Sequence, residues 1–100
     1  MRKITREACH AFESGQNYKK GNTQVKQCTI GYDKAKMYLH GNVIAIKSLC
    51  GATYITNAGY KTNVTKERLN GLTGVRIQQR NFVWYLNGVE WDGGYIRIAD

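Results

Sequence analysis

The sequence alternates apolar and polar residues with a period of two over much of its length, and one segment near the centre breaks this alternation. In residues 36–40, Met37 and Leu39 fall on one side of an extended chain, and Lys36, Tyr38 and His40 fall on the other. A period of two is typical of strands that bury one face. Because several short runs of this kind follow one another, the pattern indicates an antiparallel sheet with tight connections.

Two dipeptides that contain glycine predict the tightest of these connections. Asn87-Gly88 is a preferred pair for a type I′ turn, in which both residues have positive φ. Gly41-Asn42 predicts a second two-residue turn, one that opens with glycine. Before Gly41-Asn42, three further segments can be interpreted. The polar residues 16–22 predict a loop, Thr23 to Ile30 predict a strand, and residues 31–34 predict a further turn.

The N-terminal residues have the pattern of a helix. Ile4, Ala8 and Phe12 recur at helical spacing, and Gly15 follows them as a stop. Thr5 is the expected N-cap. These features predict a helix of about ten residues that covers one face of the sheet.

The segment that breaks the alternation, residues 56–71, predicts a second helix of about two turns. Thr62, Asn63 and Thr65 are each suited to cap its start, and Gly71 is expected to end it in the left-handed conformation. A helix this short is unstable in isolation, so its apolar residues must pack on the sheet.

Three cations of this central segment, Lys61, Lys66 and Arg68, are then expected to face solvent. Two interpretations are open. The segment is either a solvated connector or a contact surface for an anion, because a helix start and nearby cations both favour negative charge.

The order of elements is helix, three or four strands, short helix and three strands, which predicts a single α+β domain over residues 1–100. Its six to seven short strands form an antiparallel sheet, either a meander or a half-open barrel. No run approaches the ~20 apolar residues that span a bilayer, and no signal-peptide core follows the basic start. The expected location is therefore the cytosol of the cell that makes the protein, with no membrane partner.

No cofactor, metal site or enzymatic activity is predicted. The odd number of cysteines, Cys9, Cys28 and Cys50, is unlike a disulfide framework, and no CxxC or HxxxH spacing indicates zinc. A nucleophile motif and a phosphate-binding loop are both missing from the sequence. His10 lies near Glu7 and Glu13 on one helix surface, with no partner of defined role.

The net charge of +8 is the strongest compositional feature, and it is unevenly distributed. Residues 1–80 hold fourteen cations against four acids, a balance of +10, whereas residues 81–100 hold Arg97 against three acids, a balance of −2. A domain this basic attracts polyanions. The alternative is that the basic surface only keeps the protein dispersed.

Two functional hypotheses follow from charge and aromatic content. The first is binding of nucleic acid, or of a complex that processes it, with little sequence specificity. Its candidate residues are Lys61, Lys66 and Arg68, together with a strand face bearing Lys36, Tyr38 and His40 beside another bearing Arg76, Gln78 and Arg80.

The second hypothesis is a protein-binding inhibitor. Large aromatic residues are numerous for a small core: Tyr54, Tyr60, Phe82, Trp84 and Trp91. Any of them that is exposed would anchor a protein partner, and the alternative is that they pack in the core.

Three segments resemble a pattern found in small uncharacterised proteins of tailed bacteriophages. They are Leu39-His40-Gly41-Asn42-Val43-Ile44-Ala45, then Thr56-Asn57-Ala58-Gly59-Tyr60 with Thr65-Lys66-Glu67-Arg68-Leu69-Asn70, and Trp84-Tyr85-Leu86-Asn87-Gly88 with Trp91-Asp92-Gly93. The resemblance implies a phage accessory protein in the host cytoplasm. Such proteins act on nucleic-acid machinery or inhibit a host enzyme or defence protein, and the resemblance assigns no residue a role.

Overall fold

The computed structural model describes residues 2–28 and 31–98. Within these residues it has two helices, neither of them long and apolar enough to cross a membrane, and nine strands. In chain order the elements are α1 (Lys3–Ser14), β1 (Tyr18–Lys20), β2 (Thr23–Gln27), β3 (Asp33–Leu39), β4 (Asn42–Ser48), β5 (Thr53–Ile55), α2 (Asn63–Asn70), β6 (Ile77–Arg80), β7 (Val83–Leu86), β8 (Val89–Glu90) and β9 (Ile96–Ile98).

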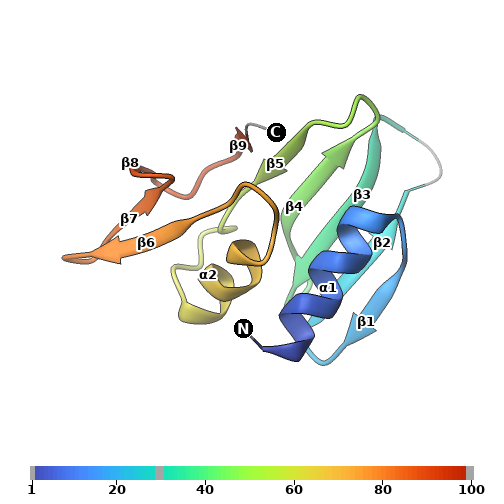
Figure 1. Cartoon of the computed structure of the whole chain (residues 1–100), viewed down its shortest axis with the longest axis horizontal. Coiled ribbons are helices and arrows are strands. Elements are labelled where there is room, and N and C mark those ends of the chain that lie inside the picture. Colours follow the sequence, from blue (N-terminus) through green and yellow to red (C-terminus); the bar gives the residue numbers. More distant parts are fainter. Residues whose placement is uncertain (1, 29–30, 99–100) are drawn as a thin grey trace.

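Six strands form an antiparallel sheet, sheet A, in the order β1-β2-β3-β4-β5-β9. Strands β1 to β5 are a meander, in which each strand pairs with the next one along the chain. Strand β9 pairs with β5 after the chain has passed through α2 and a second sheet. Helix α1 lies across one face of sheet A (Figure 1). The predicted α+β class with antiparallel strands is confirmed.

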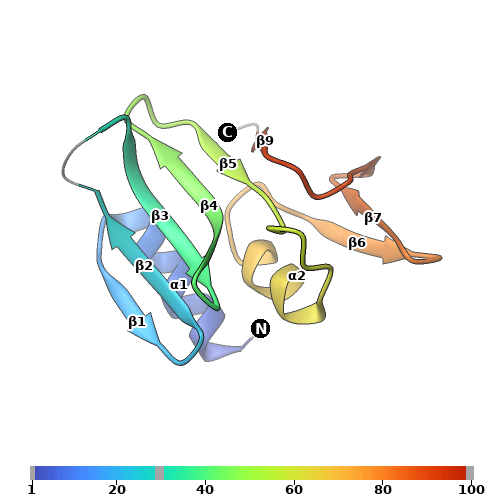
Figure 2. The same cartoon turned by 180° about the vertical axis from the view of Figure 1, so that it is seen from behind.

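Strands β6, β7 and β8 form the second sheet, sheet B, which is also a meander. Its β6–β7 hairpin projects from the side of the molecule opposite to β1 (Figures 1 and 2). Strands β1 and β9 are the two edges of sheet A. Of the two predicted architectures, the structure therefore has the meander and not the half-open barrel.

One hydrophobic core joins both helices and both sheets. Phe12 of α1, Met37 of β3, Ile55 of β5, Leu69 of α2 and Trp84 of β7 all belong to it, and each is at most 1% exposed. Met37 lies on the face that the period of two predicts to be buried, and Leu69 is one of the apolar residues of the second helix that were expected to pack against the rest of the fold. Removing apolar surface of this kind from water stabilises the fold by about 25 cal/mol per Å².

Helix α1 ends as predicted and begins differently. Gly15 ends it in the left-handed conformation, with φ of 79°. The helix starts after Arg2, whose side chain makes no capping hydrogen bond. Thr5, the predicted cap, is buried inside the helix, where its hydroxyl bonds to side chains of α2 instead of to the helix start.

Helix α2 shows the opposite outcome. It begins as predicted, with the Thr62 hydroxyl accepting a hydrogen bond from the N–H of Thr65 at 3.2 Å. The prediction for its end was wrong, because Gly71 is right-handed, with φ of −76°. A Cβ at this position would lie 2.6 Å from Cys9 Sγ and 2.7 Å from Thr5 Cγ2. Glycine is needed here because α1 and α2 approach closely, and not for a positive φ.

The Asn87-Gly88 turn is confirmed as a primed turn, with φ of 51° and 86°. The turn predicted at Gly41-Asn42 is displaced by one residue. Leu39 pairs with Asn42, so the turn consists of His40 and Gly41, with φ of 51° and 79°. Histidine tolerates the left-handed region better than most residues, and glycine then occupies the second position.

The loop predicted for residues 16–22 was wrong in part, because it contains β1. The turn predicted for residues 31–34 overlaps the start of β3 at Asp33. Strand β1 is a three-residue polar strand at the sheet edge, so it has no apolar alternation to indicate it. The strand predicted from Thr23 ends at Gln27 as β2, and residues 29–30 lie outside the described residues.

Replacing Gly88 with valine should lower the free energy of unfolding by about 1–2 kcal/mol, because a branched side chain is strained at positive φ. A Cβ at Gly88 meets nothing within 4 Å, so the loss would come from the backbone alone. Urea denaturation measures it. Gly88→Asn is the matched control, because asparagine tolerates this conformation and should cost less. An unchanged midpoint for Gly88→Val would contradict the turn.

Candidate functional site

In the described part of the chain, one face of sheet A carries no helix (Figures 1 and 2). In Figure 2 strands β1 to β4 are seen with α1 behind them and no helix in front. Side chains that alternate with core positions project from this side, because successive residues of a strand point to opposite faces. By the strand register, this open face consists of Lys19, Gln24, Lys26, Lys36, Tyr38, Val43, Ile46, Tyr54 and Arg97.

Five of these residues form a row across five strands. Lys26 pairs with Lys36, Lys36 with Ile46, Ile46 with Tyr54, and Tyr54 with Arg97. Directly opposed residues of antiparallel strands have Cβ atoms about 5 Å apart. The row therefore brings three cations and a tyrosine from separate parts of the sequence onto one line.

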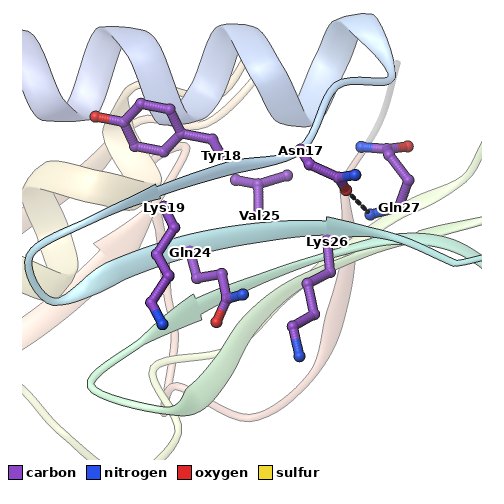
Figure 3. A pocket seen from close by; sticks show the side chains of 7 residues that line it. All are labelled: Asn17, Tyr18, Lys19, Gln24, Val25, Lys26 and Gln27. Carbon is purple, nitrogen blue, oxygen red and sulfur yellow. Dashed lines mark hydrogen bonds between the residues drawn. The ribbon is translucent and has the colours of Figure 1, made fainter.

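A second row lies beside the first. Lys19 pairs with Gln24, Gln24 with Tyr38, and Tyr38 with Val43. Figure 3 shows Lys19, Gln24 and Lys26 pointing away from α1. The Nζ atom of Lys26 lies 5.7 Å from the centre of the Tyr38 ring, so the two rows touch and cations alternate with aromatic surface.

The cations of the open face are accessible and have few acidic neighbours. Lys19, Lys26 and Arg97 are exposed, and Lys36 is half-buried. Among the described residues, Lys36 is the one cation of this face with an ion pair, to Asp33 at 3.7 Å. A solvated pair at this distance contributes little, so these cations remain available to a negatively charged ligand.

The open face is also indented. A hollow of about 520 Å³ is lined by residues of β1 and β2 that include Lys19, Gln24 and Lys26 (Figure 3). A second hollow, of about 320 Å³, is lined by Lys19, Gln24, Tyr38 and His40 among others. The two hollows are neighbours, because Lys19 and Gln24 line both of them. Their adjacent positions and shallow form suit an extended ligand.

The predicted site residues are divided between different surroundings. Lys36 and Tyr38 lie on the open face, on β3. Arg76 and Arg80 are exposed at sheet B, so the prediction that their strand lies beside that of Lys36 was wrong. A period of two assigns residues to the faces of a strand, but it does not determine which strands become neighbours.

The central cations also differ from one another. Lys61 is exposed. Lys66 is half-buried, and its Nζ donates a hydrogen bond to Gln79 Oε1 at 2.5 Å and lies 5.7 Å from the centre of the Trp84 ring. Arg68 is 1% exposed, so the prediction that it faces solvent was wrong. Its partners come from α1 and β2, which the sequence of α2 does not indicate.

Sequence patterns missed Lys19, Lys26 and Arg97 as members of this face. Lys19 lies in the segment predicted as a loop, and Arg97 lies in the segment with negative charge balance. In β9, Arg97 alternates with Ile96 and Ile98. This period of two was the available signal that Arg97 faces away from the core.

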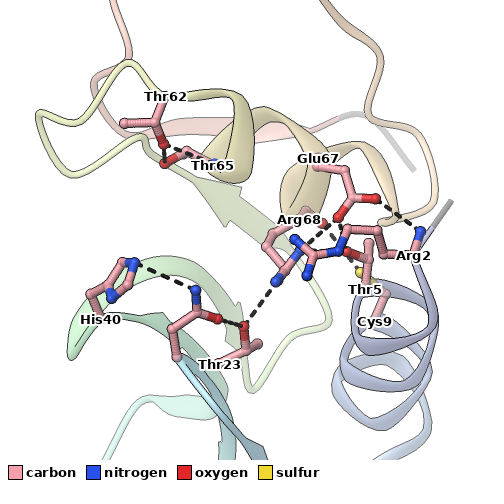
Figure 4. Close-up of polar contacts among 10 residues, drawn as sticks. Arg2, Thr5, Cys9, Thr23, His40, Thr62, Thr65, Glu67 and Arg68 are labelled. Carbon is pink, nitrogen blue, oxygen red and sulfur yellow. Dashed lines mark hydrogen bonds and ion pairs between the residues drawn. The ribbon is translucent and has the colours of Figure 1, made fainter.

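Arg68 forms a buried polar cluster that joins α1, α2 and β2 (Figure 4). Its Nε donates to Thr23 Oγ1 at 2.9 Å, and its Nη1 donates to Thr5 Oγ1 at 2.7 Å and to Glu67 Oε1 at 2.6 Å. The Thr5 hydroxyl donates to Glu67, whose Oε2 accepts a hydrogen bond from the N–H of Arg2 at 3.0 Å. The buried cation thus has both a counter-charge and hydrogen-bond acceptors, as burial requires.

This cluster lowers the pKa of Glu67. Burial acts to raise the pKa, but the hydrogen bonds from Thr5 and from the N–H of Arg2, with the charge of Arg68, outweigh burial. An unfolded glutamate titrates near pH ~4.3. Because the folded pKa lies lower, the contribution to stability is present above that pH and is lost as the pH falls through the folded pKa.

Residues considered for catalysis make structural contacts. Glu7 accepts a hydrogen bond from the Tyr18 hydroxyl at 3.1 Å, and Glu13 accepts one from the N–H of Thr73 at 3.2 Å. The three cysteines are free. In residues 2–28 and 31–98, no three His, Cys, Asp or Glu side chains are grouped to hold a metal ion. Glu7 and Glu13 therefore connect α1 to β1 and to the segment after α2.

The aromatic candidates separate into two groups. Trp84 and Trp91 are buried, with ring centroids 6.1 Å apart, so core packing explains them. Tyr54 is half-buried on the open face. Tyr60 and Phe82 are 55% and 91% exposed. Phe82 is the member of this set that the fold explains least.

Replacing Arg68 with alanine should lower the free energy of unfolding by about 3–5 kcal/mol, because it breaks a buried ion pair and leaves Glu67 and two hydroxyls without their donor. Urea denaturation measures the change. Lys61→Ala is the control, an exposed cation near the same helix whose removal should cost less than about 0.5 kcal/mol. Equal losses in the two variants would show that the cluster is not structural.

Replacing Glu67 with glutamine should reduce the loss of stability on acidification, because glutamine has no proton to bind. The expected result is a smaller difference between urea midpoints above and below pH ~4.3 than in the unmodified protein. Glu90→Gln, at an exposed carboxylate for which no such cluster exists among the described residues, is the control. The cluster would be excluded as the cause if both variants kept the original pH dependence.

Comparison with known proteins identifies the family of this chain. Curated proteins and solved structures give no match. A family model described as Kyanoviridae Gp96 protein matches residues 1–97. This agrees with the resemblance to tailed-bacteriophage proteins. Since the match covers nearly all of the sequence, the chain belongs to the Kyanoviridae Gp96 protein family, a family of cyanophage proteins.

Proposed function

We propose that this phage protein binds single-stranded nucleic acid, with little sequence specificity, through the open face of sheet A in the cytoplasm of the infected host. The observation that carries the proposal is the row Lys26, Lys36, Ile46, Tyr54 and Arg97, which crosses five strands with no helix over it.

The cations of the open face suit a sugar-phosphate backbone. Lys19, Lys26, Lys36 and Arg97 lie on one surface of a protein with a net charge of +8. Neutralising phosphates releases condensed counterions, which drives binding at low salt. The affinity for nucleic acid should therefore depend on how many of these cations contact phosphates of the bound nucleic-acid strand.

The tyrosines favour a single strand over a duplex. Tyr38 on β3 and Tyr54 on β5 are two strands apart in sheet A, about 10 Å at the usual strand spacing. Both are half-buried, so part of each remains open to solvent. Unpaired bases stack on such rings, whereas a duplex hides its base faces. Because stacking and phosphate contacts carry little sequence information, specificity should be slight.

The alternative function is inhibition of a host protein, and the exposed Phe82 favours it. An acidic protein surface would provide the same charges as nucleic acid but no bases to stack. Replacing Tyr54 with leucine separates the two cases. It should weaken binding to an oligonucleotide but not to a polyanion without bases, such as polyphosphate.

The direct test is fluorescence anisotropy with a labelled single strand at several salt concentrations. The unmodified protein should bind at ~50 mM salt, with affinity that falls steeply as salt increases. Lys26→Ala/Lys36→Ala should weaken binding and reduce the slope of log K against log salt by about 1.4, which corresponds to two lost phosphate contacts on a single strand.

The matched control is Lys3→Ala/Arg6→Ala. These exposed cations lie on α1, which covers the other face, and their removal changes the net charge equally. The control should have less effect than the open-face variant. Equal weakening by both pairs would reject the open face as the site. Absence of binding to single-stranded DNA and RNA at ~50 mM salt would reject nucleic-acid binding altogether.

A further inference from the structure

The β6–β7 turn presents a phenylalanine in an unfavourable position. Asn81 and Phe82 both have positive φ, 50° and 66°. Phe82 is 91% exposed, so burial of its ring does not offset this conformation. A bulky residue at positive φ is an outlier that calls for an explanation.

The chain itself shows the usual solution for such a turn. In the described residues, His40-Gly41 and Asn87-Gly88 are also two-residue turns with positive φ at both positions, and each has glycine second. Glycine occupies this region without strain, and a residue with a Cβ does not. Phe82 takes the place that glycine has in the other two turns.

The hairpin that carries Phe82 is cationic along the sequence. Residues 68–89 contain no aspartate or glutamate. Arg76 and Arg80 are exposed, and within the described residues neither forms an ion pair. The guanidinium of Arg80 lies 5.5 Å from the centre of the Tyr85 ring. Arg80 pairs with Val83, so it directly precedes the turn of the β6–β7 hairpin. An exposed aromatic ring beside unpaired arginines matches the chemistry of a base and its phosphates.

A hollow beside this turn limits where a ligand's phosphates can lie. It measures about 460 Å³, and its lining includes Phe82, the cation of Lys61 and the carboxylates of Glu90 and Asp92. The two carboxylates outnumber the one cation, so this hollow attracts a phosphate less than the side of the hairpin that carries arginines. The phosphates are therefore assigned to the side of β6, which ends at Arg80 and follows directly after Arg76.

We propose that Phe82 is a stacking platform for an unpaired nucleobase, and that Arg76 and Arg80 bind the adjacent phosphates. This inference rests on the proposed function, because the nucleic-acid strand whose base stacks on Phe82 would also occupy the open face of sheet A. The longest dimension of the molecule is 41 Å. A fully stacked single strand, with the duplex rise of about 3.4 Å per nucleotide, needs about 12 nucleotides to span this length, and an extended strand needs fewer. A strand of about 20 nucleotides can therefore reach from one region to the other.

The experiment uses a nucleic-acid single strand of about 20 nucleotides in which 5-bromouracil is placed as a photocrosslinking probe of side chains that contact the base. Mass spectrometry of the crosslinked protein should identify Phe82. Replacing Phe82 with glycine should abolish that crosslink and weaken binding about tenfold. The same variant should raise the melting temperature, by about 2–5 °C, because it relieves the strain. A Phe82→Gly variant that is more stable and yet binds nucleic acid more weakly is the result that a purely structural role of Phe82 would not give.

Three further variants separate stacking from general apolar contact. Phe82→Trp should keep the crosslink and the affinity, because a ring is retained. Phe82→Leu should lose both, although it is apolar. Tyr32→Ser, which removes a 90% exposed aromatic residue elsewhere on the surface, should have no effect.

The outcomes distinguish this inference from the proposed function. If the unmodified protein binds the strand but Phe82→Gly binds equally well, the role of Phe82 is rejected and the open face stands. Crosslinks confined to Tyr38 or Tyr54 would likewise reject Phe82 and leave the open face as the site. If Phe82→Gly is no more stable than the unmodified protein, the strain argument fails. If the unmodified protein binds no single strand, both proposals fail.

Discussion

The guanidinium of Arg68 is the interaction on which the arrangement of layers depends. It donates hydrogen bonds to Thr5 of α1 and Thr23 of β2, and Glu67 supplies the counter-charge. A buried charge is tolerated only with such partners, so α1, α2 and β2 must come together in this geometry. Because Thr5 and Thr23 face this cluster, α1 is held on one side of sheet A. The opposite side keeps the cations and tyrosines that alternate with the core.

Close packing between the helices supports the same cluster. Gly71 lets the end of α2 approach Cys9 and Thr5, and the Cys9 thiol donates a hydrogen bond to the Arg68 carbonyl at 3.3 Å. Burial, together with the nearby charge of Glu13, raises the pKa of Cys9 to about 12. Cys9 therefore remains a neutral thiol and serves as a small packing group and donor.

Sequence patterns predict what depends on neighbouring residues and miss what depends on distant ones. The alternation around Met37 and Leu39 predicts the buried face of β3. The dipeptide Asn87-Gly88 predicts the turn between β7 and β8. Both signals lie within a few residues of the feature that they predict. The burial of Arg68 depends on partners that lie 45 and 63 residues away. The open face is predicted in part: Lys36 and Tyr38 are identified, but Arg97 reaches them only through the pairing of β9 with β5.

The pairing of β9 with β5 also places charges in space differently from their distribution along the sequence. Along the sequence, Arg97 belongs to a segment with a balance of −2, yet in the fold it extends the cationic row of sheet A. Glu90 and Asp92 of the same segment line the hollow beside Phe82. These acids are thus placed near sheet B, while cations from four strands of sheet A, β1, β2, β3 and β9, share one surface. An asymmetric distribution of charge of this kind is the arrangement that orients a charged partner before contact.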